Sequence, residues 1–241
     1  MINIRKKPSP SFLIWAAFLL ALVCPRLAPG AAGTTAAPDL RALAQSNLAV
    51  HRFSTLFTAQ NVRDCLTNNG GIETAIAWCR QTAVSKIYLE VFRGDYQAER
   101  ATLECARDAF RKAGFEVSGC VTTTRVGKAS TGWKEHIACY SDLPTQERLR
   151  SIFQYAASLF DEIMVDDFWF TDCTCPACDK ARQARTVTIA GKTYTVTGDT
   201  WEDYRGELML RLSEECLLNA AKQVNRKARL IIKYPQWYDQ F

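Results

Sequence analysis

The sequence predicts an α/β protein, and within that class a TIM (β/α)8 barrel that is truncated after its fifth strand. Strand-like and helix-like patterns alternate in units of roughly 30 residues, which is typical of parallel strands joined by right-handed helical crossovers. Charged and aromatic residues gather where the predicted strands end, and a barrel holds its chemistry at that end. No G-x-G-x-x-G motif follows the first strand, so a dinucleotide-binding sheet is not supported.

The barrel part is expected over 51–241. Runs rich in β-branched and aromatic residues predict its strands, and apolar residues at three-to-four spacing predict its helices. The strands are expected at 52–58, 86–92, 116–122, 162–168 and 229–234, and the helices at 74–82, 99–113, 144–160 and 201–224. Alternation around Ala190-Gly191-Lys192 predicts a hairpin inserted near 186–197. Because a complete barrel needs further strand–helix units, the sequence is interpreted as the N-terminal part of a longer protein.

The first 32 residues have the order of a secretory signal peptide. Three basic residues at 5–7 precede an apolar run at 12–23, and small residues follow. The run is too short to span a bilayer comfortably, so we expect export to the periplasm or the outside without stable membrane insertion. Val23 before Cys24 makes a lipoprotein anchor the less favoured alternative. A linker rich in Ala, Gly, Thr and Pro is expected to follow over 33–50.

The charge pattern argues against a nucleic-acid partner. The formal net charge is +5, but basic and acidic residues are mixed along the chain. No basic stripe interleaved with aromatic residues is present, and such a stripe is the usual footprint of nucleic-acid binding. Diffuse positive charge of this kind is more often simple solvation of the surface.

Two adjacent carboxylates, Asp166 and Asp167, end the fourth predicted strand and are the candidate catalytic residues. Side chains alternate along a strand, so the two are expected to face opposite ways. We expect Asp166 to contact the substrate and Asp167 to support it or bind substrate. A carboxylate at this place can act as a nucleophile, a general base or a stabiliser of an oxocarbenium-like transition state. The plain alternative is that Asp166 pairs with Arg93 or Lys233 while Asp167 caps the following loop.

The other strand ends carry aromatic residues beside charged ones. That combination suits carbohydrate, because sugar rings stack on aromatic faces while their hydroxyls bond to polar groups. Trp133 is a further stacking candidate, although a tryptophan is more often simple packing. The predicted substrate-binding residues are Glu90, Arg93, Trp169, Lys233, Tyr234 and Trp237.

The loop after the fourth strand carries Cys173, Cys175 and Cys178 in a C-x-C-x-x-C pattern. A structural zinc ion takes four ligands in a tetrahedron, so one more is required. Cys139 is the first choice and Cys120 the second, with His136 also nearby in the sequence. A disulfide with Cys139 is the open alternative, because export permits oxidation.

With this cysteine loop and a following helix that carries Trp201, Tyr204 and Arg205, the sequence resembles (β/α)8 glycoside hydrolases. It is most similar in pattern to the family 42 β-galactosidases and to uncharacterised barrel hydrolases of bacteria. The resemblance implies a structural zinc held by the cysteine loop and an earlier cysteine. The galactosidases carry an Asn-Glu pair where this chain has Asp166-Asp167, so the resemblance does not extend to galactosidase activity.

The expected function is therefore that of an exported glycoside hydrolase acting on carbohydrate. An aspartate at the mouth of the fourth strand would serve as nucleophile or acid/base, and the second carboxylate is expected beyond Phe241. The alternative from another class is a non-catalytic carbohydrate-binding barrel. A metal-dependent hydrolase is weaker, because His51 and His136 are the two histidines that the sequence offers as ligands.

Overall fold

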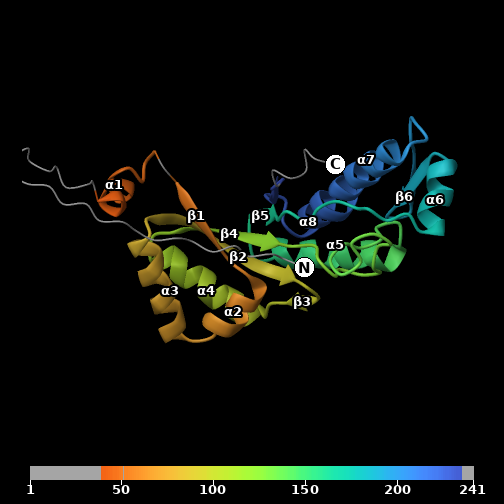
Figure 1. Cartoon of the computed structure of the whole chain (residues 1–241). Coiled ribbons are helices and arrows are strands. Elements are labelled where there is room, and N and C mark those ends of the chain that lie inside the picture. Colours follow the sequence, from red (N-terminus) through yellow and green to blue (C-terminus); the bar gives the residue numbers. More distant parts are fainter. Residues whose placement is uncertain (1–38, 51, 235–241) are drawn as a thin grey trace, which may run out of the picture. The chain divides into compact units, whose positions relative to one another are not determined.

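The computed structural model describes residues 39–50 and 52–234, and it confirms an α/β fold with a mostly parallel sheet (Figure 1). The predicted signal peptide and Trp237 lie outside these residues. The helices are α1 (Leu40–Ser46), α2 (Ala59–Cys65), α3 (Asn69–Gln81), α4 (Arg100–Lys112), α5 (Leu143–Ala157), α6 (Pro176–Gln183), α7 (Trp201–Leu212), the π-helical η1 (Ser213–Leu218) and α8 (Asn219–Val224). The strands are β1 (Phe53–Phe57), β2 (Val84–Arg93), β3 (Tyr96–Gln97), β4 (Glu116–Val121), β5 (Glu162–Val165), β6 (Thr186–Ile189), β7 (Lys192–Thr195) and β8 (Arg229–Ile232).

The central sheet has the order β1-β2-β4-β5-β8, and all of these neighbours pair in parallel. The short β3 adds to β2 in the antiparallel sense. Strand order follows chain order without reversal, which is consistent with part of a barrel. A doubly wound sheet would instead reverse its order at a switch point. All five strands therefore point the same way, and their C-terminal ends lie along one edge of the sheet.

One face of the sheet is apolar and buried. Ile87, Leu89 and Val91 alternate along β2 and are fully buried. On the neighbouring strands Ile163 and Val165 share this burial. Helices α3 and α4 contact β2, and α5 contacts β4 and β5 (Figure 1). The hydrophobic effect thus fixes the register, because a shift by one residue would turn this whole set away from the helices.

The opposite face carries an ionic network near the N-terminal ends of the strands. Lys86 of β2 binds Glu116 of β4 at 3.0 Å and also binds Glu162 of β5. Ser118 donates a hydrogen bond to Glu162 at 2.8 Å, and Arg229 of β8 lies 3.3 Å from its other oxygen. This network links β2, β4, β5 and β8 at the end remote from Asp166.

Capping residues explain two helices that differ from the sequence prediction. Helix α2 was not predicted; Thr58 begins it by accepting a hydrogen bond from the Asn61 N–H, and Asn61 reciprocates in a capping box. Helix α3 begins at Asn69 rather than at 74, because the Asn68 side chain accepts from the Gly71 N–H. Gly70 and Gly71 therefore lie inside the first turn of α3.

Three further elements differ in extent. The expected linker over 33–50 contains α1, whose N-cap Asp39 accepts from Arg41 N–H. Helix α6 was not predicted and follows directly on Cys175, with Pro176 in its first turn. The expected helix over 201–224 is interrupted by η1, whose π-helical turn shifts the following side chains around the axis.

Strands β6 and β7 form an antiparallel hairpin within the expected range. Its turn residues Ala190 and Gly191 both have positive φ, as a two-residue turn of the primed type requires. The hairpin is held to η1 by Glu215, which binds Lys192 and the Tyr194 hydroxyl at 2.7 Å each. The hydrogen bond from Lys192, with that from Tyr194, lowers the pKa of Glu215 to about 2.

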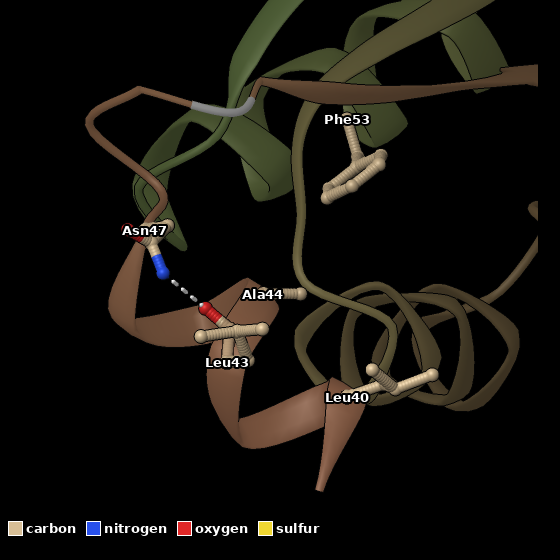
Figure 2. Close-up of a pocket in the computed structure, with 5 residues that line it drawn as sticks. All are labelled: Leu40, Leu43, Ala44, Asn47 and Phe53. Atoms are coloured by element: carbon tan, nitrogen blue, oxygen red, sulfur yellow. Dashed lines mark hydrogen bonds between the residues drawn. The ribbon is translucent and has the colours of Figure 1, made fainter. Parts of the chain in front are cut away.

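An open hollow of about 400 Å³ lies between α1 and β1, where Figure 2 shows Phe53 facing the helix. Leu40 and Leu43 line it, and the Asn47 side chain donates to the Leu43 carbonyl at 2.8 Å. It is at the N-terminal end of β1 and holds no titratable group. Within 39–50 and 52–234, no helix combines the length and hydropathy that a membrane crossing requires.

We predict that Gly119→Ala destabilises the fold by about 1–3 kcal/mol through overpacking. A Cβ at this position of β4 would lie 2.7 Å from a ring carbon of the buried Phe160. The matched control is Gly206→Ala in α7, where a Cβ meets nothing within 4 Å, so stability should rise by up to about 1 kcal/mol. Urea unfolding measures both. A wild-type midpoint for Gly119→Ala would contradict the described packing of Phe160 on β4.

Candidate functional site

The C-terminal ends of β2, β4, β5 and β8 bring a set of polar side chains together. Three of these residues continue the hydrogen-bond ladder just past their strands. The Thr122 N–H donates to Phe92, the Asp166 N–H to Val121 and the Lys233 N–H to Val165, all at 2.9–3.0 Å. Each side chain is therefore aimed by sheet backbone rather than by a loop.

Asp166 is the centre of this set. It is 3% exposed, and Arg93 Nη2 donates to its Oδ2 at 2.8 Å while Lys233 Nζ donates to its Oδ1 at 2.9 Å. The Thr122 hydroxyl lies 3.3 Å from Oδ2. Burial acts to raise the pKa of Asp166, but the hydrogen bond from Lys233 and the charges of Lys233 and Arg93 outweigh it and hold the pKa below its usual value. The ion pairs that the plain alternative required are thus present.

Glu90 lies behind Arg93 and is fully buried. Its carboxylate accepts from Arg93 Nε at 2.8 and 3.0 Å, from the Ala59 N–H at 2.8 Å and from the Thr122 hydroxyl. Burial acts to raise the pKa of Glu90 against these donors. The sequence placed Glu90 among substrate-binding residues; the structure gives it the geometry of a brace that orients Arg93 and Thr122.

Asp167 shares a cation with Asp166, which strict alternation of side chains would not predict. Strand β5 ends at Val165, so the two aspartates follow it rather than extending its pleat. Asp167 Oδ2 lies 3.6 Å from Lys233 Nζ, the same ammonium that binds Asp166. The Asp167 side chain is 26% exposed and that of Asp166 is 4% exposed. Asp167 is therefore the more accessible carboxylate at this mouth.

The predicted aromatic contacts have different surroundings. Trp169 is 4% exposed, donates from Nε1 to Ser213 Oγ at 2.9 Å and packs on Tyr140 with ring centroids 5.2 Å apart. Trp169 thus joins the segment after β5 to the η1 helix through Ser213. Tyr234 is 65% exposed next to Lys233, and Trp237 lies beyond the described residues.

A cluster of rings outside the predicted site set lies beside Asp167. Trp133 and His136 come from the long loop after β4, and Phe168 and Phe170 come from the segment after β5. The Trp133 centroid lies 4.8 Å from His136, 5.7 Å from Phe168 and 6.5 Å from Phe170. Of these rings, Trp133 alone was a candidate from the sequence, because no short-range pattern links two loops that are more than thirty residues apart.

Four cysteines form a compact buried cluster. The sulfur atoms of Cys139, Cys173, Cys175 and Cys178 all lie within 4.8 Å of one another. Three of the separations are 3.6, 3.7 and 3.8 Å, and none of the four is in a disulfide. Four sulfurs bound to zinc at about 2.3 Å would be about 3.8 Å apart. Cys139 is thus the fourth member of the cluster, as the sequence predicted.

The alternative fourth ligands lie elsewhere. Cys120 contacts Glu90 at 3.9 Å, and His136 belongs to the ring cluster. Around the cysteine cluster, Ser141 Oγ lies 3.0 Å from Cys178 Sγ and 3.2 Å from Cys139 Sγ. A hydrogen bond from Cys178 lowers the pKa of Cys139 to about 4, against burial, which acts to raise it. The four closely spaced sulfurs fit a tetrathiolate metal ion, whose binding would release the thiol protons.

Comparisons with known proteins give a matching family, a similar protein and a similar solved structure. The model of a family described as "Probable glycosyl hydrolase, catalytic domain" matches residues 39–241. An uncharacterized protein of Saccharolobus solfataricus is 26% identical over 191 residues, which are 72% of this chain and 31% of that protein. The chain thus spans about a third of the length of this relative. A hypothetical protein from Ruminiclostridium thermocellum has a crystal structure that covers 74% of this chain and 96% of its own, with 10% identity and a TM-score of 0.44.

We predict that Asp166→Asn lowers the free energy of unfolding at pH 7 by about 3 kcal/mol, because it leaves two cations without their shared carboxylate. The folded state holds the pKa of Asp166 below its unfolded value, so this stabilisation is present above about pH 4 and is lost as the pH falls further. Urea unfolding between pH 3 and 7 measures the difference.

The control for this experiment is Asp95→Asn. Asp95 pairs with Arg148, but both side chains are exposed, by 62% and 43%. Loss of this pair should cost less than about 1 kcal/mol at any pH. An Asp166→Asn variant that matches this control, or whose deficit grows as the pH falls, would contradict the described ion pairs.

Proposed function

The chain belongs to the family of probable glycosyl hydrolase catalytic domains, and from this premise we propose that it is part of an exported glycoside hydrolase whose carboxylates at the end of β5 act on a glycosidic bond. The observation that carries the proposal is the pairing of one ionised, cation-bound carboxylate with an adjacent accessible one. A barrel that closes beyond the five described strands would place this mouth at its catalytic end. Export rests on the signal-peptide pattern at 1–32.

We assign Asp167 to the substrate and Asp166 to its support, the reverse of the order expected from the sequence. Both oxygens of Asp166 are already bound by Arg93 and Lys233, which leaves little room for an anomeric carbon. Asp167 is accessible and shares Lys233. A negative charge beside the anomeric centre stabilises an oxocarbenium-like transition state, and a carboxylate there can also attack or activate water.

The remaining residues of the mouth then have positioning roles. Arg93 is fixed by Glu90 on one side and by Asp166 on the other. Lys233, which is 50% exposed, can reach both an aspartate and a substrate hydroxyl. This arrangement keeps charge fixed before substrate binds, and preorganised charge is usually the largest contribution of an active site.

We also propose that the cysteine cluster binds a structural zinc ion. Cys139 from the loop after β4 would be joined to Cys173, Cys175 and Cys178 after β5. Four thiolates leave no open position on the metal, so the ion would brace the loops and would not act on substrate. A disulfide mixture is the competing outcome, since export favours oxidation.

A non-catalytic carbohydrate-binding protein is the second candidate. The observation in its favour is that Glu90 is fully buried and both oxygens of Asp166 are bound by cations. A protein that held these groups for stability alone could still offer Asp167 and the exposed rings to sugar hydroxyls and ring faces.

We predict that the full-length protein hydrolyses members of a panel of aryl glycosides and that Asp167→Asn lowers kcat/KM by about 100-fold or more. The thermal midpoint should not change, because Asp167 has one partner at 3.6 Å. The matched control is Asp64→Asn on α2, an exposed aspartate paired with Arg63, which should retain activity. Absence of hydrolysis in the parent, together with binding of oligosaccharides, would favour the second candidate.

We predict about one equivalent of zinc in protein purified without chelator, and less than about half an equivalent in Cys178→Ser. Elemental analysis measures the zinc content, and visible absorption after replacement by Co²⁺ reports tetrahedral thiolate ligation. The control is Cys216→Ala, which removes a buried thiol of η1 outside the cluster and should keep the metal. A wild type with less than about half an equivalent would favour disulfides.

A further inference from the structure

We infer that Trp133, Phe168 and His136 form a sugar-stacking subsite beside Asp167, and that the cysteine cluster positions this subsite through Asp172 and Thr131. The inference rests on the proposed function for its ligand, a pyranose ring of an oligosaccharide. To the proposed function the inference adds a second binding site for the sugar chain. It also gives a structural reason for the position of the cysteine cluster.

Trp133 is the exposed ring of this subsite, and His136 and Phe168 are partly buried beside it. Trp133 is 45% exposed, and His136 meets it edge-on at 79° with a centroid distance of 4.8 Å. Phe168 lies 5.7 Å from Trp133 and 6.0 Å from His136. The exposed part of the indole is apolar, and such a surface suits the C–H groups of a sugar ring.

The subsite is continuous with the carboxylates. Phe168 follows Asp167 directly, its N–H donates to the Asp166 carbonyl at 2.8 Å, and its own carbonyl accepts from Thr123 Oγ1 at 2.9 Å. The backbone of Phe168 is therefore fixed relative to the candidate catalytic residues. A sugar on Trp133 would extend toward Asp167 from a neighbouring position along the same chain of sugars.

The loop that carries Trp133 is bound to the cysteine loop through Thr131 and Trp133, on either side of Gly132. The Trp133 N–H donates to Asp172 Oδ2. Thr131 Oγ1 accepts from the Thr174 N–H at 2.7 Å and lies 3.9 Å from Cys173 Sγ. These contacts surround Gly132, where a Cβ would lie 2.3 Å from Asp172 Oδ2. The two loops thus fit without room for a side chain.

Both loops also end in the cysteine cluster. Cys139 lies six positions after Trp133, and Cys173 lies directly after Asp172. A metal or disulfide that joins these cysteines fixes the ends of both segments. The Asp172 contact then sets the position of Trp133 between those ends.

Carbohydrate is the occupant that the surroundings favour. The rim of the rings carries Lys134, Glu135 and Asp167, of which the first two are exposed and the third is partly exposed. Mixed charges around an aromatic face match the alternating hydroxyls and C–H groups of a sugar. A protein partner would be expected to need a larger apolar area than four rings provide.

The experiment measures binding of four hexasaccharides (cello-, xylo-, malto- and mannohexaose) to the full-length protein by calorimetry. Wild type should bind at least one of them, and Trp133→Ala should weaken that binding about 10-fold or more. The matched control is Trp78→Ala on α3, since Trp78 is exposed to a similar degree, 48%, and its loss should leave binding unchanged. Equal binding by wild type and Trp133→Ala, or no binding by wild type, would overturn the inference.

Asp172 is tested as a positioning residue. Asp172→Ala should weaken hexasaccharide binding about 5-fold while the zinc content stays the same, and Asp172→Asn should restore it because an amide oxygen still accepts from the Trp133 N–H. Failure of this rescue, or loss of zinc in both variants, would overturn the positioning role. If aryl glycosides are not hydrolysed but these binding results hold, the proposed hydrolysis fails and the subsite stands.

Discussion

The ion pairs of Asp166 are the interaction on which the described site depends. One carboxylate joins Arg93 from β2 to Lys233 after β8, and Thr122 after β4 lies against it. Because Arg93 is the last residue of β2, and Thr122, Asp166 and Lys233 continue the ladder just past their strands, correct strand register is needed before the charges can meet. A buried charge of this kind stabilises the fold only when all of its partners are present, so the mouth of the sheet forms as a unit.

The cysteine cluster applies a second constraint a short distance along the chain. The segment between Asp166 and Cys173 is held at both ends, by the ion pairs at the first and by the cysteine cluster at the second. Phe168 and Trp169 lie between these ends and take opposite roles. Trp169 packs inward on Tyr140, whereas Phe168 joins the exposed rings around Trp133. This short segment thus connects the ion pairs of Asp166, the cysteine cluster and the rings around Trp133.

Much of the fold could be predicted from local pattern. The parallel strands followed from alternating apolar runs, and the hairpin from its glycine turn. Helix α2 and the start of α3 could not, because caps at Thr58 and Asn68 depend on single side-chain hydrogen bonds. The cysteine cluster was predicted because three of its members are close in sequence. The anchoring of Trp133 by Asp172 was not, since it joins two loops through one backbone N–H.

The sequence by itself determined the α/β class, the position of the aspartate pair at the end of β5, and three of the four clustered cysteines, because these depend on periodicity and short spacing. Tertiary structure decided which carboxylate is accessible. Alternation predicted that Asp166 and Asp167 face opposite ways, yet β5 ends at Val165, and Arg93 of β2 and Lys233 after β8 enclose Asp166. Those cations are about seventy residues away from Asp166 in the chain. Local sequence patterns cannot show that residues so far apart meet, because only the folded sheet brings them together.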